Sequence, residues 1–475
     1  MGGAIKYIIA IKRRLPLRKK IETQPCFFLN FTRITQIVKD YQKKYDGIGF
    51  VLENNPGILD AFHNDLKDFG STNGRESKFS SEQILRFAVV KCVEGDPYRE
   101  TIIRVTGSDF LRNFTRIGMG EVPGYTFFCE AMKRIRPATL EAMNALLLQY
   151  GKDKGLVSGK SLRVDSTVSE SNIHYPTDAH LLWDGYRTLA RMMTRARKAD
   201  WRLDCGNRLH TRKAKSLFTF VSTHGGKKNK STKRKVDKKM RTLMERVDWI
   251  VEIARRFSKH ACDVGCNSIA AYGIVGEIER MIPKVAHVAL QARRAWINGE
   301  TVPAAERIFS IFEDHTELLM RGKTRQPIEF GHLVTLGQTQ EKFISYYAVE
   351  EKSRHDSIYK DEVLADHKKK FGSYPDRFTA DKNYHVSVED TRKWEKEIDL
   401  YAVGKKGGRN IDEEHREHTE EFRLAQRFRA GCEGTISVLK RAFGLKRVLN
   451  RGFKSFAAAI GCLVFCHNLV LLALP

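Results

Sequence analysis

Apolar residues recur at helical spacing through most of residues 31–160. In Ser80–Gly95, four of them share one face, and the opening serines can cap the helix. Gly and Pro interrupt the neighbouring amphipathic runs, so we predict several short helices forming an all-α domain. Residues 1–30 are basic and lack this pattern, so we predict a disordered leader there.

One of these helices is a candidate for reading DNA. We predict it over Tyr125–Ile135, with Lys133 and Arg134 near its end. Short helices with clustered basic residues favour a helix-turn-helix-type domain, in which such a helix enters the major groove. The alternative is a helical bundle used only for self-association.

The period changes to two at Ser161–Val168, which predicts a strand. Leu162 and Val164 form one set of alternate residues, and Arg163 and Asp165 form the other. The strand therefore has an apolar face and a polar face, with Asp165 toward its end.

Further strands follow a helical stretch at residues 171–300. Gly331–Leu336 and Lys342–Val349 predict a hairpin, RFTAD predicts a short strand that closes on Asp381, and DLYAV predicts another. Helices separate the later strands. With residues 171–300 removed, the order is a three-strand meander feeding a βαβαβ half, which predicts an α/β fold with one mixed sheet and helices on its faces.

The apolar run Phe456–Leu474 is about one membrane span long. It contains His467 and Asn468 in its middle, and it directly follows a basic segment. We therefore predict a buried terminal helix, and a membrane span is the weaker alternative.

The formal net charge is +26, from 83 Lys and Arg against 57 Asp and Glu, and the excess is spread along the chain. This pattern is typical of proteins that bind polyanions, with nucleic acid as the first candidate and an anionic membrane surface as the weaker one. Nine scattered cysteines indicate a reducing compartment. Cys262 and Cys266, like Cys462 and Cys466, lack a second pair at zinc-finger spacing, so we expect no such site.

Much of the positive charge lies in residues 171–300, which we predict to be a basic helical insertion. Gly225 and Gly226 followed by Lys227–Lys239 indicate a mobile basic loop that contacts DNA, and the alternative is a solubilising surface. The candidate contacts there are Lys227, Lys228, Lys233 and Arg234. Trp183 is either a core residue or a platform on which an unpaired base stacks.

The residue types of Gln426–Asn450 predict an amphipathic helix, with Gly444 as a stop signal. Arg429, Glu433 and Lys440 fall within roughly 40° of one another around its axis. Alone, this stripe is more typical of a solvated series of salt bridges.

Two upstream carboxylates change that interpretation. Asp165 and Asp381 are predicted at strand ends, where sites form in such sheets, and Glu433 approaches on the last amphipathic helix. Three converging carboxylates repel unless a cation joins them, and Mg²⁺ prefers oxygen ligands. The sequence therefore predicts a magnesium site.

The chain resembles a bacterial insertion-sequence DDE transposase with an RNase H-like core, from the superfamily of the fourth and fifth insertion-sequence families and most similar to its ISNCY-type group. The resemblance is carried, in order, by RVDSTV, HLLWDGYR, IEFGH, TADKNY and RAGCEGTISVLKRAFGLKR. The family signature Tyr-x2-Arg-x3-Glu-x6-Lys matches at Arg429, Glu433 and Lys440, and it departs at Gln426, where Tyr is expected.

The resemblance implies that Asp165, Asp381 and Glu433 are the catalytic ligands of two Mg²⁺ ions, for which Mn²⁺ can substitute. Arg429 and Lys440 would hold phosphates beside the scissile bond. Residues 161–170 and 301–475 would form the RNase H-like core.

The implied function is transposition. The chain would bind the terminal inverted repeats of an insertion sequence through residues 31–160, cleave the double-stranded DNA and join the freed end to target DNA. It would act in the bacterial cytoplasm as a homodimer or larger assembly, on nucleoid DNA and without a membrane. The alternatives are a catalytically inactive DNA-binding regulator and a structure-specific nuclease.

Overall fold

The computed structural model describes Lys20, Phe69 and residues 35–67, 77–227, 229–320 and 327–473. Apart from Lys20, the predicted leader at residues 1–30 lies outside these ranges, as does Lys228. The chain divides into two compact units. The first contains the described residues up to Ser169 together with Leu333–Asn450 and the residues from Lys454 onward, and the second contains Glu170–His332 and Arg451–Phe453.

Helices form the first part of unit 1, as the apolar spacing predicts. Ser80 caps one of them with a capping box: its hydroxyl accepts from the Gln83 N–H at 3.1 Å, and the Gln83 side chain accepts from the Ser80 N–H at 2.9 Å. The segment predicted to be a DNA-recognition helix, Tyr125–Ile135, is helical up to Arg134. Its assignment to a helix-turn-helix stays a prediction. The helices are α1 (Gln36–Glu53), α2 (Pro56–Leu66), α3 (Ser81–Val93), α4 (Tyr98–Thr106), α5 (Asp109–Phe114), α6 (Tyr125–Arg134) and α7 (Pro137–Asp153).

A mixed sheet follows, with the order β2-β3-β1-β5-β6. β4 pairs antiparallel with β3, which confirms the predicted hairpin, and β5 pairs parallel with both β1 and β6. The strands are β1 (Ser161–Ser171), β2 (Glu317–Met320), β3 (Ile328–Thr339), β4 (Ile344–Val349), β5 (Arg377–Ala380), β6 (Leu400–Val403) and β7 (Arg447–Val448). The α/β prediction is confirmed, and the sheet with its helices is compatible with an RNase H-like core.

The predicted end of the first strand is wrong. β1 continues to Ser171, so Asp165 lies in its middle rather than toward its end. The strand continues because β7 also pairs with it, and because the Ser169 hydroxyl donates to the Leu445 carbonyl at 2.8 Å. These partners lie far away in the sequence, so the local alternation of residues could not predict them.

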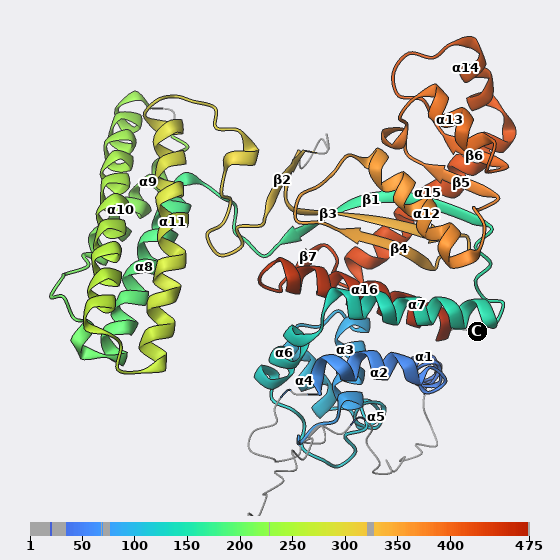
Figure 1. Cartoon of the computed structure of the whole chain (residues 1–475), viewed down its shortest axis with the longest axis horizontal. Coiled ribbons are helices and arrows are strands. Elements are labelled where there is room, and N and C mark those ends of the chain that lie inside the picture. Colours follow the sequence, from blue (N-terminus) through green and yellow to red (C-terminus); the bar gives the residue numbers. More distant parts are fainter. Residues whose placement is uncertain are drawn as a thin grey trace, which may run out of the picture. The chain divides into compact units, whose positions relative to one another are not determined.

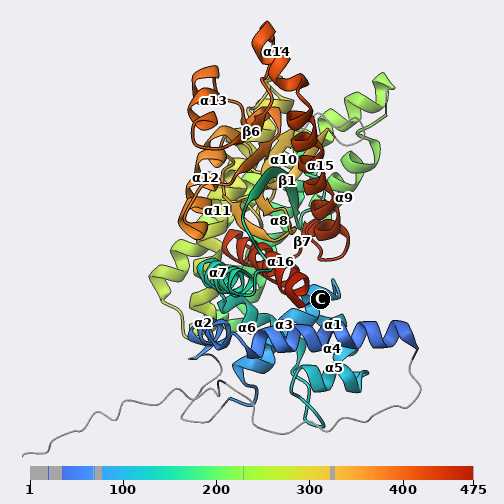
Figure 2. The ribbon, with the colours of Figure 1, turned by 90° about the vertical axis from the view of Figure 1, so that its right-hand side faces the viewer.

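The two faces of β1 are covered as its alternation predicts. Leu162 and Val164 pack in a core with residues of α12 (Asp356–Phe371) and α13 (Val388–Glu395). On the opposite face lies α15 (Glu420–Arg441), which follows α14 (Ile411–His418) (Figure 2). The polar face of β1 therefore looks toward the helix that carries Glu433.

The apolar C-terminal run forms α16 (Phe453–Ala473), whose residues join the core of α1–α7 and of β3 and β4. It is the one described helix long and apolar enough to cross a membrane, yet 72% of its most apolar window is buried inside the structure. Asn468 is fully buried, donates to the Ile344 carbonyl at 2.9 Å and accepts from the Ile344 N–H at 2.9 Å. This polar clamp and the burial support the prediction of a core helix.

Unit 2 contains four long helices that share one core. They are α8 (Asp178–Ala199), α9 (Thr211–His224), α10 (Lys230–Val264) and α11 (Ile269–Trp296) (Figure 1). Trp183 packs against this core and stacks on Phe218, with ring centroids 5.8 Å apart. The interpretation of Trp183 as a core residue accounts for this contact.

The prediction of a loop through Lys227–Lys239 is wrong for most of its length. The Asn229 side chain accepts from the Ser231 N–H at 2.9 Å and caps α10, so the chain is helical from Lys230. The reason is an apolar stripe that begins within the basic run, because Val236 and Met240 are buried one turn apart.

The IEFGH motif lies on β3, and its last residue, His332, belongs to a buried chain of hydrogen-bonded side chains in unit 2. His332 is fully buried, and its Nε2 lies 2.7 Å from Nδ1 of His315. The other ring nitrogen of His315 lies 2.9 Å from Glu313, which also accepts from the Gly452 N–H at 2.8 Å. The motif thus has a structural role that its sequence alone does not reveal.

The clamp made by Asn468 generates a prediction about stability. Asn468→Ala removes the partners of the Ile344 N–H and of the Asn144 side chain, which bonds to Asn468 at 2.7 Å. Buried polar groups left without partners each cost about 1–3 kcal/mol, so we expect the free energy of unfolding to fall by about 2–4 kcal/mol. Denaturant unfolding measures it. The control is Gln149→Ala on the exposed side of α7, and equal stability of the two variants would contradict the prediction.

Candidate active site on the polar face of the sheet

The polar face of β1 is joined to α15 by a buried arginine. The Arg163 guanidinium donates to the Gln338 side-chain oxygen at 2.8 Å and to the Phe428 carbonyl at 2.8 Å. It also lies 4.7 Å from the centroid of the Phe428 ring. Burial lowers the pKa of Arg163. Because a buried guanidinium requires partners, these contacts fix α15 on the sheet.

A glycine makes this contact possible. A Cβ added at Gly431 would lie 2.1 Å from one terminal nitrogen of Arg163 and 3.0 Å from its central carbon. Any larger residue would therefore push Arg163 away or lift α15 off the strand. A second link comes from Gln338, whose amide donates to the Thr435 hydroxyl at 2.8 Å.

The parallel pairing of β1 and β5 relates two of the predicted acids. The register pairs Leu162 with Phe378 and Arg163 with Thr379. β5 ends at Ala380, and the backbone of Asp381 directly after it is still extended (φ −71°, ψ 161°). If this register continued for two more residues, Asp165 would be opposite Asp381, with the strands about 4.8 Å apart.

Arg429 connects the third acid to the first. One of its terminal nitrogens lies 3.8 Å from Asp165, and the other lies 3.5 Å from Glu433. Its Nε donates to the Gln426 side chain at 3.2 Å. The guanidinium thus lies between two carboxylates and offsets their mutual repulsion. The Glu433 side chain is 65% exposed, whereas that of Asp165 is 15% exposed.

Gln426 occupies the position at which the family signature has Tyr. Its amide donates to the Ala402 carbonyl at 2.6 Å, on β6. The same nitrogen lies 3.5 Å from the Ala380 carbonyl, immediately before Asp381. In this chain the residue therefore orients Arg429 and braces α15 against the ends of two strands.

Behind Asp165 lies a buried polar network. The Ser166 N–H donates to Asp165 at 2.8 Å, and the Ser166 hydroxyl lies 2.6 Å from the hydroxyl of Tyr384. Burial raises the pKa of Tyr384, so its hydroxyl stays protonated. On the other side, burial and the charge of Asp165 raise the pKa of the Cys432 thiol to about 12. Asp165 is thus held between neutral hydroxyl and thiol groups on one side and the Arg429 guanidinium on the other.

The donor set suits a hard divalent cation. Asp165, Asp381 and Glu433 offer only carboxylate oxygens, which Mg²⁺ and Mn²⁺ accept as ligands. The structure places a positive charge between two of them in the form of Arg429, so this position favours a cation. These three acids could hold the metal once Arg429 turns aside.

The other predicted contacts with DNA lie elsewhere on the chain. Lys440 is half-buried, two turns beyond Glu433 on α15. Lys133 and Arg134 are exposed at the end of α6, where Lys133 pairs with Glu130 at 2.6 Å. The rest belong to unit 2, where Lys227, Lys233 and Arg234 are exposed near the start of α10.

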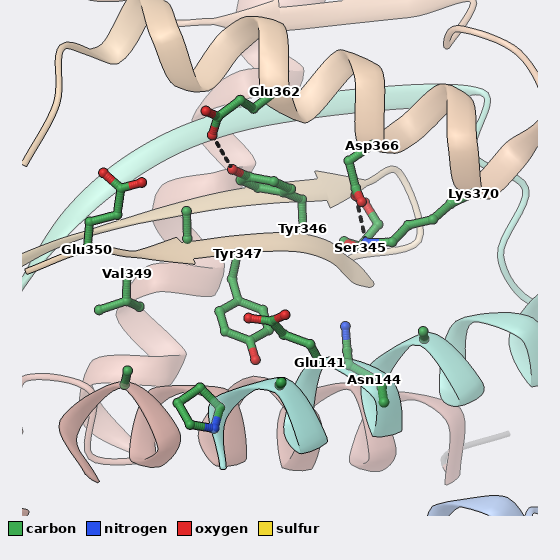
Figure 3. Close-up of a pocket in the computed structure, with 16 residues that line it drawn as sticks. Glu141, Asn144, Ser345, Tyr346, Tyr347, Val349, Glu350, Glu362, Asp366 and Lys370 are labelled. Atoms are coloured by element: carbon green, nitrogen blue, oxygen red, sulfur yellow. Dashed lines mark hydrogen bonds and ion pairs between the residues drawn. The ribbon is translucent and has the colours of Figure 1, made fainter. Parts of the chain in front are cut away.

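A separate cavity of about 570 Å³ lies between α7, β4 and α12 and has several acids in its wall (Figure 3). Its carboxylates are largely neutralised by partners. Glu362 pairs with Arg354 at 2.6 Å, and Asp366 pairs with Lys370 at 2.6 Å. Since none of the three predicted catalytic acids lines it, this cavity is distinct from the candidate active site.

One comparison with known proteins gave a match, to the C-terminal part of the chain. Residues 403–473 match the family described as the transposase DDE domain. The matched segment starts at the end of β6 and includes Glu433, α15 and α16. Neither the curated proteins nor the solved structures gave a match.

The matched domain, with a mixed sheet compatible with it, supports the class of a DDE-type transposase. More particularly, the match supports the identification of the chain as an insertion-sequence DDE transposase, as its motifs indicate. The ISNCY-type group stays a prediction.

The contact between Gly431 and Arg163 can be tested with two glycines of one helix. Gly431→Ala should lower the free energy of unfolding by about 1–3 kcal/mol, because the added methyl overlaps the buried guanidinium. Gly434→Ala meets nothing within 4 Å and should raise it by roughly 0.5–1 kcal/mol, since alanine is the better helix former. Chemical denaturation of both variants gives the comparison. A Gly431→Ala protein as stable as the Gly434→Ala protein would show that α15 does not depend on this close approach.

Proposed function

We propose that the chain binds the terminal inverted repeats of an insertion sequence and catalyses Mg²⁺-dependent cleavage and strand transfer of DNA. One observation carries the proposal: Arg429 contacts both Asp165 and Glu433. The domain match and the net charge of +26 support a polyanionic substrate.

Each residue of the site has a distinct task. Asp165, Asp381 and Glu433 are the metal ligands, with Mg²⁺ as the ion and Mn²⁺ as its substitute. Two bound ions would activate a water or a 3′-hydroxyl and stabilise the leaving oxygen of the phosphodiester. Arg429 is held between acids in the absence of DNA. When the charge of those acids is neutralised, its guanidinium can donate two parallel hydrogen bonds to a phosphate.

Recognition of the DNA ends is assigned to the helices of residues 31–160, with Lys133 and Arg134 of α6 among the contacts. Lys440 holds a phosphate on the active-site face of α15. The exposed basic residues near the start of α10 add contacts that do not depend on sequence. Because two ends must be brought together, the working form is a homodimer or a larger synaptic assembly on bacterial nucleoid DNA in the cytoplasm.

The third acid is tested by Glu433→Gln. The substitution keeps the size and helix propensity of the side chain but removes the charge that holds the ion, so cleavage of labelled end DNA in Mg²⁺ should fall by about 100-fold or more. Binding of end DNA should persist, because phosphate contacts come from Arg and Lys. The control is Glu421→Gln, which alters an exposed acid in the first turn of the same helix.

The same assay separates the alternatives. Full cleavage by the Glu433→Gln protein would remove this residue from the site. A parent protein that binds end DNA without cutting it would be a regulator. Equal cutting of DNA that lacks the terminal repeats would identify a structure-specific nuclease.

The basic start of α10 is tested by the salt dependence of binding. Replacing Lys233, Arg234 and Lys235 with Gln should reduce the slope of log K against log salt by about 0.9 for each phosphate that the protein no longer neutralises. The reason is that fewer counterions leave the DNA. A matched control replaces Arg255, Arg256 and Lys259, three exposed cations further along α10. Equal slopes in the two triple variants would mean that the region acts only through net charge.

A further inference from the structure

Three cysteines meet where α3 packs against α16. Sγ of Cys92 lies 3.3 Å from Sγ of Cys462, and the sulfurs of Cys92, Cys462 and Cys466 all lie within 4.8 Å of one another. The three side chains are buried, with at most 7% of any of them exposed. All the cysteines among the described residues are free thiols, so no disulfide there accounts for the approach.

The cluster borders a small cavity. Its volume is about 40 Å³, which exceeds the 10–15 Å³ that one water requires. Cys92 and Cys462 line it together with Asn450, Tyr98 and Met132. Two of the three cysteines therefore border a space that can hold a fourth, neutral oxygen ligand.

The cluster lies in a core that offers no water shell to a charged group. All three side chains are buried, so a lone thiolate there would be an uncompensated negative charge. A divalent cation bound by the three sulfurs would offset it.

We propose that Cys92, Cys462 and Cys466 form a structural zinc site that ties α3 to α16. Three sulfurs at 2.3 Å from one tetrahedral ion lie roughly 3.8 Å apart. This distance falls between the 3.3 Å that separates Cys92 from Cys462 and the 4.8 Å within which all three sulfurs lie. Each cysteine binds the ion as a thiolate, so every sulfur that enters as a thiol releases its proton to water. The fourth ligand is a water in the cavity or the side-chain oxygen of Asn450.

The charge of the buried complex selects the ion. Three thiolates leave a net charge of −1 on Zn²⁺ but −2 on Cu⁺, and an apolar core penalises the larger charge more strongly. Hard cations such as Mg²⁺ are excluded, because they require oxygen ligands. This site is therefore chemically separate from the carboxylates of the candidate active site, and it does not depend on the proposed reaction.

The experiment uses the full chain, purified under reducing conditions and washed with a mild chelator. We expect one zinc per chain by elemental analysis. After replacement of zinc by Co²⁺, a thiolate-to-cobalt charge-transfer band should appear, which Co²⁺ bound to carboxylates does not give. The double variant Cys462→Ala and Cys466→Ala should lose both the zinc and the band. Cys432→Ala, which removes a buried cysteine outside the cluster, should keep both.

Two results in the parent protein would overturn the proposal. One is a chain without zinc that takes up Co²⁺ with no charge-transfer band. The other is a disulfide between Cys92 and Cys462, found by peptide mapping after alkylation. Both measurements are made on the parent chain, so they decide the question even if the double variant does not fold. Neither outcome bears on DNA cleavage.

Discussion

The close approach of Arg163 to Gly431 is the contact on which the candidate active site depends. A buried guanidinium is costly without partners, and Arg163 reaches one of its partners, the Phe428 carbonyl, only when α15 lies directly on β1. This approach also fixes the rotation of α15 about its axis. Arg429 and Glu433 lie on the same helix, close to Gly431 in sequence, so their positions over Asp165 follow from that rotation.

The site is preorganised by an internal cation. Carboxylates that converge in a folded protein raise its free energy unless positive charge lies among them. Arg429 supplies that charge from within the chain, and Gln426 holds it in place. The fold can therefore bring Asp165 and Glu433 to one guanidinium without a divalent ion.

Short sequence patterns predicted the elements that depend only on neighbouring residues. The serine cap of α3, the alternation of β1 and the hairpin of β3 and β4 were read correctly from the chain. The full length of β1 and the helical start of α10 were not predicted. Each depends on distant partners or on burial, which the nearby residues do not encode. The mixed α/β class followed from the order of the elements.

The motifs predicted the residues of the candidate site. They did not predict the buried contacts that hold those residues in place. Arg163 reads in the sequence as an ordinary polar residue of a strand, and only its burial reveals that it holds α15. The cluster of three cysteines is hidden in the same way, because 370 positions separate Cys92 from Cys462. Spacing rules detect ligands that are close in sequence, whereas helix packing brings together ligands that are not.

The packing of α16 has a consequence for biosynthesis. Its residues fill the core of α1–α7, which leave the ribosome more than three hundred residues earlier. Until α16 emerges, the apolar surfaces that these early helices bury against it have no partner and are prone to aggregation. The sheet also forms late, because β1 pairs with β5 only after the helices of unit 2 have been made. The core of unit 1 is therefore complete only when the last helix has been synthesised.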